Sequence, residues 1–166
     1  MVLDSMEQKA LAYAGTRGAM LGDNLGFGVD GSAWIMHGKN RNHPWAVKLF
    51  RHEKPYRLEK ACYLRLQESR IETIRRFAIP AYLSHDDSWL ALEMTIVRPP
   101  FVLDFAGAAL DEPFDFDADT WDLWEQDRME KFEERWPEVK KVMRDLEWLG
   151  IYLSDIHPGN IAFEPD

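Results

Sequence analysis

Three glycines between two β-like stretches constrain the fold of this chain more than any other feature. Gly26, Gly28 and Gly31 form the pattern G-x-G-x-x-G. A strand leads into them and a second strand is predicted over 32–37, so the glycines lie in a strand–turn–strand unit. The dinucleotide-binding fingerprint needs a helix directly after its glycines, which disfavours that fold. A strand–turn–strand loop can fold over phosphates with its backbone N–H groups, and the alternative is a plain glycine-rich hairpin.

The chain up to residue 97 predicts five strands and one helix. The helix opens at Pro55 and runs to about residue 69, because apolar residues recur there at helical spacing. Polar residues rich in Gly and Asn between the second and third strands favour a hairpin loop. The expected strands are the stretch leading into Gly26 and the ranges 32–37, 45–50, 78–84 and 89–97, with a turn at 85–87 joining the last two.

Pro99 and Pro100 predict a boundary between two lobes. They remove two backbone donors and prevent a helix from continuing. The expected domains are therefore residues 1–98 and 99–166. After the boundary we expect a helix around 120–136 and another that starts at Pro137 and stops at a left-handed glycine. The second helix has an apolar stripe of Val139, Val142, Met143, Leu146 and Leu149, and its stop is Gly150.

Lys48 is a candidate for anion binding. Strand alternation places it on the same face as Ala46, and a lysine on an apolar face needs an anionic partner. Glu59, on the predicted helix, can reach back to pair with it, and Glu68 and Glu72 are competitors. The alternative is an edge-strand lysine whose ammonium extends to water.

The closing loop Asp-Ile-His-Pro-Gly-Asn holds Asp155 and Asn160 in one turn-rich segment. A carboxylate there can accept the proton of an attacking hydroxyl, and an amide oxygen can bind a divalent ion that carries phosphates. Asp, Pro, Gly and Asn are also common turn formers, so an ordinary loop is the alternative.

Taken in order, these features resemble the protein-kinase-like superfamily, which includes protein kinases and the aminoglycoside and choline phosphotransferases. A glycine loop is followed by a strand with A-x-K, a helix with Glu, two strands, a connector, a helix and a D-x-x-P-x-N loop. The resemblance covers residues 17–163. It implies an α+β fold, with a five-stranded antiparallel sheet and one αC-type helix in an N-lobe at 1–98, and a minimal, truncated helical C-lobe at 99–166.

The resemblance also implies ATP and Mg²⁺ as ligands. Lys48 and Asp155 would be catalytic, as the phosphate contact and as the base, and Asn160 would be a Mg²⁺ ligand. The D-x-H-P-G-N form, with His157, is more similar to small-molecule and atypical kinases than to typical protein kinases. The residues implied at the nucleotide are Gly26, Gly28, Gly31, Ala46, Lys48, Glu59, Glu93 and Thr95, the last two on the strand beside the adenine.

The sequence departs from the family pattern at three points. Leu153 stands where the family usually has His, and the family's D-F-G aspartate follows the loop Asn by about a dozen residues, whereas six residues follow Asn160 in this sequence. The activation segment and the later helices are also missing. The expected function is therefore a kinase-like protein that transfers the γ-phosphate of ATP to a hydroxyl. The alternatives are an inactive pseudokinase or interaction module without the D-F-G metal site, and a part of a longer protein.

Charge bears on the partners that the chain can bind. The chain has 20 Lys and Arg against 29 Asp and Glu, a formal charge of −9, which disfavours nucleic acid and anionic membranes. Nine of the acidic residues lie within 104–127, which has no Lys or Arg. This acidic segment predicts contact with a cationic substrate or a protein partner. The alternative is a solvated linker, which the aromatic residues within the segment disfavour.

The sequence also bears on location. It has no apolar stretch of membrane-helix length, and its first residues are acidic where a secretion signal would be basic. Cys62 is the only cysteine, so no disulfide can form within the chain. A cytoplasmic protein is expected.

Overall fold

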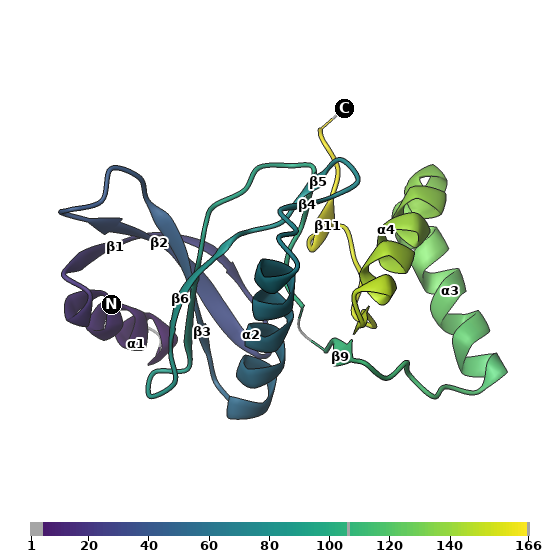
Figure 1. Cartoon of the computed structure of the whole chain (residues 1–166). Helices are drawn as coiled ribbons and strands as arrows, with labels where there is room; N and C mark the ends of the chain where they lie inside the picture. Colours follow the sequence, from purple (N-terminus) through teal and green to yellow (C-terminus); the bar gives the residue numbers. More distant parts are fainter. Residues whose placement is uncertain (1–4, 106, 166) are drawn as a thin grey trace. The chain divides into compact units, whose positions relative to one another are not determined.

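The computed structural model describes residues 5–105 and 107–165, and the chain divides into two compact units (Figure 1). The protein is α+β. Because the chain enters the second unit, returns to the first and leaves it again, neither unit is one continuous stretch of sequence. Unit 1 comprises the described residues up to Lys60 together with Ala81–Ile96, and unit 2 comprises Ala61–Pro80 and the described residues from Val97 onward.

A five-stranded antiparallel sheet forms most of unit 1, as predicted. Its strand order is β1-β2-β3-β7-β6, and each neighbouring pair is antiparallel. The fourth strand begins later than expected, because residues 77 and 78 pair in a different sheet. The turn to the fifth strand lies at 87–90 instead of 85–87. The strands are β1 (Ala19–Phe27), β2 (Gly31–Gly38), β3 (Trp45–Phe50), β6 (Tyr82–Asp86) and β7 (Ala91–Met94).

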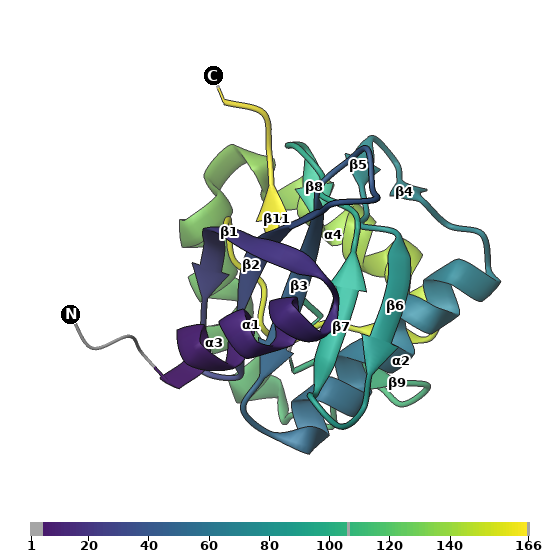
Figure 2. The ribbon, with the colours of Figure 1, turned by 90° about the vertical axis from the view of Figure 1, so that its left-hand side faces the viewer.

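A helix that the sequence analysis did not predict, α1 (Ser5–Thr16), lies across one face of this sheet (Figure 2). Its buried residues recur at helical spacing and join the apolar side chains of β2 and β3 in one core cluster. The cluster includes Met6, Ala10, Tyr13 and Ala14 of α1, and Trp34, Met36, Trp45, Val47 and Leu49 of the sheet. One face of the sheet is therefore closed by the start of the chain.

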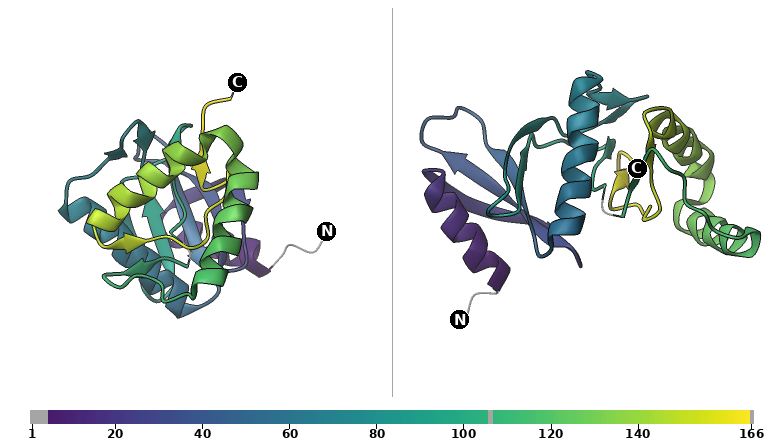
Figure 3. Two further views of the ribbon diagram at one scale, coloured as in Figure 1. Left: turned by 90° about the vertical axis from the view of Figure 1, so that its right-hand side faces the viewer. Right: turned by 60° about the horizontal axis from the view of Figure 1, so that its bottom comes forward.

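The predicted helix after β3 is α2 (Glu53–Glu68), with Pro55 in its first turn. Its first two turns belong to unit 1 and lie on the opposite side of the sheet from α1 (Figure 3, right). The helix buries an apolar stripe that contains one charged residue, Glu59. The stripe is Tyr56, Glu59, Cys62, Tyr63 and Leu66.

Unit 2 contains α3 (Ala118–Phe132), the 3₁₀ turn η1 (Glu133–Arg135) and α4 (Trp136–Trp148), with α3 and α4 side by side (Figure 3, left). The predicted apolar stripe of α4 is confirmed, since Val139, Val142 and Leu146 are buried. Gly150, with φ of +74°, ends the helix as predicted. None of the helices in the described part of the chain has both the length and the apolar character that a membrane crossing requires.

Short strands hold the closing loop of unit 2 at both of its ends. Because β10 pairs with β9 and β11 pairs with β8, residues 153–160 form a loop between two anchored strands. The other pairings extend the sheet of β11 to the order β11-β8-β5-β4. These strands are β4 (Thr73–Ile74), β5 (Phe77–Ala78), β8 (Phe101–Val102), β9 (Ala109–Leu110), β10 (Ile151–Tyr152) and β11 (Ile161–Ala162).

Candidate functional site

Lys48 and Glu59 form an ion pair in unit 1, as the sequence predicted. The Lys48 Nζ lies 2.7 Å from Glu59 Oε2, with side-chain exposures of 12% and 1%. The ammonium also lies 5.0 Å from the ring centroid of Phe50, at the end of the same strand. Two charges this far out of water need each other, because either one alone would be left desolvated. The pair therefore fixes one ammonium group at a defined position on the sheet.

The sheet register explains the position of Lys48. In the register of the sheet Lys48 stands opposite Ala33 of β2 and opposite Leu92 of β7, so it occupies a central strand. Ala46, implied at the nucleotide, lies two positions before it on the same face and is buried. A central strand excludes the edge-strand alternative for Lys48. The lysine faces α2, away from α1.

The three glycines lie at and beside the turn between β1 and β2: Gly26 near the end of β1, Gly28 in the turn and Gly31 at the start of β2. Only one of them is required by packing. A Cβ on Gly31 would lie 2.2 Å from the Leu49 carbonyl oxygen, so β2 could not approach β3 with any other residue there. A Cβ on Gly26 would meet no atom within 4 Å, and one on Gly28 would meet only the Gly31 carbonyl oxygen, at 4.0 Å. Neither Gly26 nor Gly28 has positive φ. Intramolecular packing gives no reason for these two glycines, whereas close approach of a ligand to the backbone would.

Glu93 and Thr95, which the resemblance implies at the nucleotide, have side chains that form hydrogen bonds within the protein. Glu93 is fully buried, and its Oε1 accepts hydrogen bonds from the Tyr13 hydroxyl and from Arg17 Nε, each 2.8 Å long. Thr95 Oγ1 accepts from the Ala81 backbone N–H at 2.8 Å. The Glu93 side chain therefore faces α1, on the opposite side of the sheet from Lys48. The Thr95 side chain binds the backbone of Ala81, where the chain re-enters unit 1. A nucleotide role of their backbone groups stays a prediction.

The closing loop of unit 2 is locked by Asn160 and presents Asp155. The buried Asn160 donates from Nδ2 to the Asp155 carbonyl oxygen at 2.6 Å and accepts from the His157 N–H at 2.9 Å. Ser154, just before the aspartate, donates to the Gly107 carbonyl oxygen at 3.0 Å. Within the described residues, the exposed Asp155 carboxylate has no hydrogen bond or ion pair. The loop thus holds a carboxylate toward solvent on a backbone that its own amide fixes.

Asn160 has limited capacity as a metal ligand. Its Oδ1 already accepts one hydrogen bond, which leaves one lone pair of a carbonyl-type oxygen. Across residues 5–105 and 107–165, no group of three or more His, Cys, Asp and Glu side chains could hold a metal ion. A Mg²⁺ ion that arrives with a nucleotide needs only one or two protein oxygens, because phosphates and water supply the rest. A role of Asn160 as such a single ligand stays a prediction.

The acidic segment is folded where the structure describes it, and part of its charge is neutralised. Asp111 accepts two hydrogen bonds from Arg65, which lower the pKa of the Asp111 carboxyl. Asp117 caps α3 by accepting from the Thr120 N–H at 2.7 Å, the main reason that the Asp117 pKa is lowered. Among the described residues, four acidic side chains of the segment have no hydrogen bond or ion pair: Glu112, Asp115, Asp119 and Asp122.

An aromatic row runs through the same segment and continues to α4. Phe114 stacks on Phe116 with centroids 5.4 Å apart, and each later ring meets the next edge-on at 5.2 to 6.0 Å. Phe116 is 38% exposed. Aromatic packing of this kind contradicts a solvated linker. The aromatic row consists of Phe114, Phe116, Trp121, Trp124 and Trp136.

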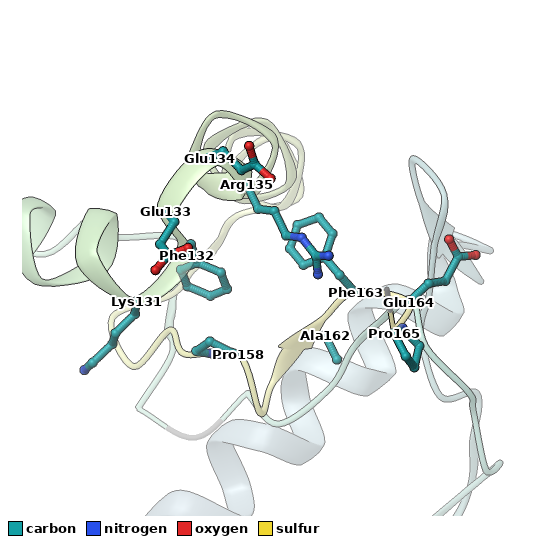
Figure 4. A pocket seen from close by; sticks show the side chains of 10 residues that line it. All are labelled: Lys131, Phe132, Glu133, Glu134, Arg135, Pro158, Ala162, Phe163, Glu164 and Pro165. Carbon is teal, nitrogen blue, oxygen red and sulfur yellow. The ribbon is translucent and has the colours of Figure 1, made fainter.

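A pocket of about 400 Å³ opens elsewhere in unit 2 (Figure 4). It is bordered by the end of α3, by η1, by Pro158 of the closing loop and by the chain after β11. The side chains of Phe132 and Phe163 form its apolar walls, and Lys131 lies at its margin. None of the residues predicted for the functional site lines it. The pocket lining mixes both charges and defines no ligand class.

Sequence reasoning missed the partners that hold Glu93 and the partners of Asp87. Tyr13 lies on the unpredicted α1 and Arg17 directly follows it, and the alternating small and large apolar residues of this helix give only a weak signal. Burial, followed by the Glu93 hydrogen bond, raises the pKa of the Tyr13 hydroxyl. The sequence predicts a turn at Asp87 and no further role for it.

Comparisons of the chain with protein-family models, with curated proteins and with solved structures found no match.

Proposed function

We propose that this chain has a protein-kinase-like fold and binds ATP through unit 1. The order of elements supports the proposal: a glycine hairpin, a strand with Lys48, a helix with Glu59 and two further strands of the same sheet. Lys48 would bind the phosphates, and the backbone of Gly26 and Gly28 would cover them. Both glycines have the open surroundings that such an approach requires.

The buried Lys48–Glu59 pair carries the proposal. A buried ion pair adds little to stability, because desolvation offsets the attraction, and apolar residues of similar volume often stabilise a fold as well or better. Folding alone therefore gives no reason to hold an ammonium at this position. An ammonium fixed by a carboxylate is suited to bind an anion. Since Lys48 stands opposite Ala33, two residues after Gly31, a polyphosphate under the glycine hairpin is the anion that fits.

We assign phosphoryl transfer to Asp155 of unit 2. In this step the hydroxyl oxygen of the acceptor bonds to the γ-phosphorus, and the bond from that phosphorus to the β–γ bridging oxygen breaks. ADP leaves, and the hydroxyl proton passes to the Asp155 carboxylate. Asp155 suits this role because it is exposed on a loop that Asn160 fixes. Mg²⁺, with Asn160 as a ligand, would supply charge neutralisation at the phosphates. A pseudokinase would bind ATP in the same way without the transfer.

Binding and turnover of ATP test the two roles separately. Lys48→Met should weaken ATP binding by about tenfold to a hundredfold, since a hydrogen bond to a charged group contributes about 1.5 to 3 kcal/mol. Asp155→Ala should leave ATP affinity unchanged and abolish ADP formation. Calorimetry measures the affinity, and a coupled ADP assay measures turnover.

Each outcome leads to a different conclusion. Wild-type protein that does not bind ATP, with or without Mg²⁺, contradicts the proposal as a whole. Binding without turnover above the Asp155→Ala level supports the pseudokinase. A thermal-shift assay gives a second measure of binding, because a ligand at 100 times its Kd adds about 2.7 kcal/mol to stability.

The acidic segment and its aromatic row favour a second function, the binding of a cationic partner. Three unneutralised carboxylates, Asp115, Asp119 and Asp122, lie within the stretch that carries the rings from Phe114 to Trp124. Aromatic faces attract ammonium and guanidinium groups, and nearby carboxylates add long-range attraction. We propose that this surface binds a Lys- or Arg-rich segment of another protein.

A charge-matched comparison tests this second function. The triple variant Asp115→Asn, Asp119→Asn and Asp122→Asn should lose most of its affinity for a synthetic arginine-rich peptide, and wild-type binding should weaken as salt rises. The control replaces three exposed glutamates of the same unit, Glu68, Glu130 and Glu147, by glutamine. Equal losses in both variants would reduce the effect to net charge and contradict a specific surface.

A further inference from the structure

The turn between β6 and β7 is hydrogen-bonded to the helix that carries Glu59. Asp87 Oδ1 accepts two hydrogen bonds from α2, one from the Tyr56 hydroxyl at 2.6 Å and one from the Lys60 ammonium at 2.6 Å. Tyr56 and Lys60 stand one turn apart on the same side of α2, and the ammonium also lies 4.9 Å from the Tyr56 ring centroid. One carboxylate oxygen of the β6–β7 turn thus binds side chains from two consecutive turns of the helix.

The turn that presents Asp87 is itself fixed. Its neighbour Asp86 accepts hydrogen bonds at Oδ1 from the Ser88 hydroxyl at 2.6 Å, from the Ser88 N–H at 3.0 Å and from the Trp89 N–H at 3.3 Å. The Leu90 carbonyl oxygen accepts from the Phe50 N–H at 3.0 Å, which ties the turn to the end of β3. Asp87 is therefore a fixed acceptor and not the tip of a loose loop.

The contacts of Asp87 with α2 lie next to the Lys48–Glu59 pair. Glu59 stands between Tyr56 and Lys60 in the sequence of α2, three residues after the first and one before the second. The Tyr56 ring is buried and meets Phe50 edge-on, with centroids 5.6 Å apart, and Phe50 is the residue whose ring lies below the Lys48 ammonium. A shift of this part of α2 would therefore move Glu59 relative to Lys48.

We propose that Asp87 is a positioning residue: by holding Tyr56 and Lys60 it fixes the rotation and height of α2 at which Glu59 meets Lys48. Asp87 acts through the helix and contacts neither Lys48 nor a ligand. The consequence for nucleotide affinity rests on the proposed function, whereas the consequence for the ion pair does not.

An exposed ion pair without further role is the competing explanation. The Asp87 side chain is 69% exposed, and exposed pairs contribute little to stability. The two explanations differ in what they predict at Lys48. A simple surface pair, once removed, changes global stability slightly and leaves Lys48 as it was. A positioning residue, once removed, changes the environment of Lys48 in the folded protein.

The accessibility of the Lys48 amine tests the proposal without any nucleotide. The full chain is treated with a limiting acetylating reagent in its native state, and the rate at each lysine is read by mass spectrometry. Asp87→Asn should raise the rate at Lys48 by about threefold, in proportion to the weak interaction that is lost. Tyr56→Phe, which keeps the ring and removes the hydroxyl, should act in the same direction. Glu59→Gln sets the upper limit of the rate.

A second ion pair on the same helix provides the matched control. Arg57 and Glu53 form an exposed pair four residues apart on α2, without a contact to the β6–β7 turn. Glu53→Gln should leave the Lys48 rate unchanged. Lys9 on α1, whose ammonium donates to the Phe50 carbonyl oxygen at 2.8 Å, serves as the internal reference and should react equally in all variants.

The results separate the two proposals. An unchanged Lys48 rate in both Asp87→Asn and Tyr56→Phe, with a raised rate in Glu59→Gln, overturns the positioning role and leaves ATP binding untouched. A rise at Lys48 and Lys9 together indicates general loosening and overturns it as well. A rise confined to Lys48 supports the positioning role, even where wild-type protein binds no ATP. If ATP binds, Asp87→Asn should weaken it by about the same threefold factor.

Discussion

The two faces of the unit 1 sheet carry the same kind of charge pair in different settings. On the α1 face, Glu93 is enclosed and receives hydrogen bonds from a tyrosine hydroxyl and from Arg17. On the α2 face, Glu59 holds the ammonium of Lys48 on a central strand beside the glycine hairpin. Around Glu93 an apolar cluster closes the face, with Tyr13 as part of it. The first pair fastens a helix to the sheet, and the second positions a cation.

The contrast shows that a buried carboxylate near a cation does not by itself mark a ligand site. The settings of the two cations differ. The cation of the α1 face, Arg17, directly follows the helix that covers the sheet, so the pair joins the end of that helix to the sheet. The cation of the α2 face belongs to the sheet itself and lies near two glycines that packing does not require. Substitutions on the α1 face should therefore lower stability, whereas substitutions on the α2 face should mainly weaken ATP binding.

The largest expected effect is at Glu93. Glu93→Ala removes the acceptor of both Tyr13 and Arg17 and should lower the free energy of unfolding by about 3 kcal/mol, because it leaves the buried Tyr13 hydroxyl without its acceptor and removes the ion pair with Arg17. Urea denaturation measures the loss, and hydrogen exchange should show faster exchange in α1. Glu93→Gln, which keeps one acceptor oxygen, should have a smaller effect. If Glu93→Ala preserved stability but removed ATP binding, the assignment of the α1 face would be wrong.

The next effect concerns the Lys48–Glu59 pair. Lys48→Met alone should lower the free energy of unfolding by about 2 kcal/mol, since it removes the cation that lies beside the fully buried Glu59. The double variant Lys48→Met, Glu59→Leu should recover stability to within about 1 kcal/mol of wild type, because apolar residues can replace a buried pair. ATP binding should stay lost in both variants. A double variant as unstable as the single one would give the pair a structural role like that of Glu93.

Much of the α2 face could be predicted from sequence. Alternation on β3 gives the orientation of Lys48, and the burial of Glu59 follows from the stripe of α2 on which it lies. The α1 face could not be predicted, because a helix with alanines at its contact positions has a weak apolar pattern. The orientation of Glu93 depends on the register of β7 against β3, where Leu92 stands opposite Lys48, so that its neighbour Glu93 faces the other way. That register is set by tertiary pairing.

The same limit applies to Asp87 and to the strand predicted over 78–84. The sequence predicts a turn, but the hydrogen bonds that Asp87 accepts from Tyr56 and Lys60 depend on where that turn lies in space. It also assigned residues 78–84 to one strand, whereas the chain leaves one sheet at Ala78 and enters another at Tyr82. Local pattern does not distinguish one continuous strand from two short ones in different sheets.

The two faces should respond to opposite ends of the pH range. Hydrogen bonds from Lys60 and then Tyr56 lower the pKa of Asp87 from 3.8 to about 2, so its contribution is present above pH 3.8 and lost as the pH falls toward 2. Because the Tyr13 pKa is raised above its ordinary value of 10, the contribution of Tyr13 is present below pH 10 and lost above it.

Matched variants test this pH contrast. Urea unfolding midpoints should fall less in Asp87→Asn than in wild type between pH 4 and pH 2.5. Above pH 10 the midpoint should fall less in Tyr13→Phe than in wild type. If neither substitution changes its pH profile, the two hydroxyl contacts to carboxylates do not form as the structure has them.

The smallest effect on stability is expected at the glycine hairpin. Gly28→Ala should change the free energy of unfolding by less than about 1 kcal/mol, since a Cβ there meets only one atom, at 4.0 Å. The same variant should weaken ATP binding, because the new methyl group would occupy the space over the phosphates. Gly15→Ala on α1, where a Cβ also meets nothing within 4 Å, is the control and should leave ATP affinity unchanged.

The central claim is that the Lys48 ammonium, fixed by Glu59, binds a phosphate group of ATP. Nuclear magnetic resonance of the side-chain ammonium nitrogens of the full chain, recorded during titration with ATP, tests it directly. We predict that the Lys48 signal shifts and saturates while the signals of Lys9 and Lys140 stay in place, and that the shift disappears in Glu59→Gln. A Lys48 signal that does not move while ATP is added, or that moves only together with every other lysine, would contradict the claim.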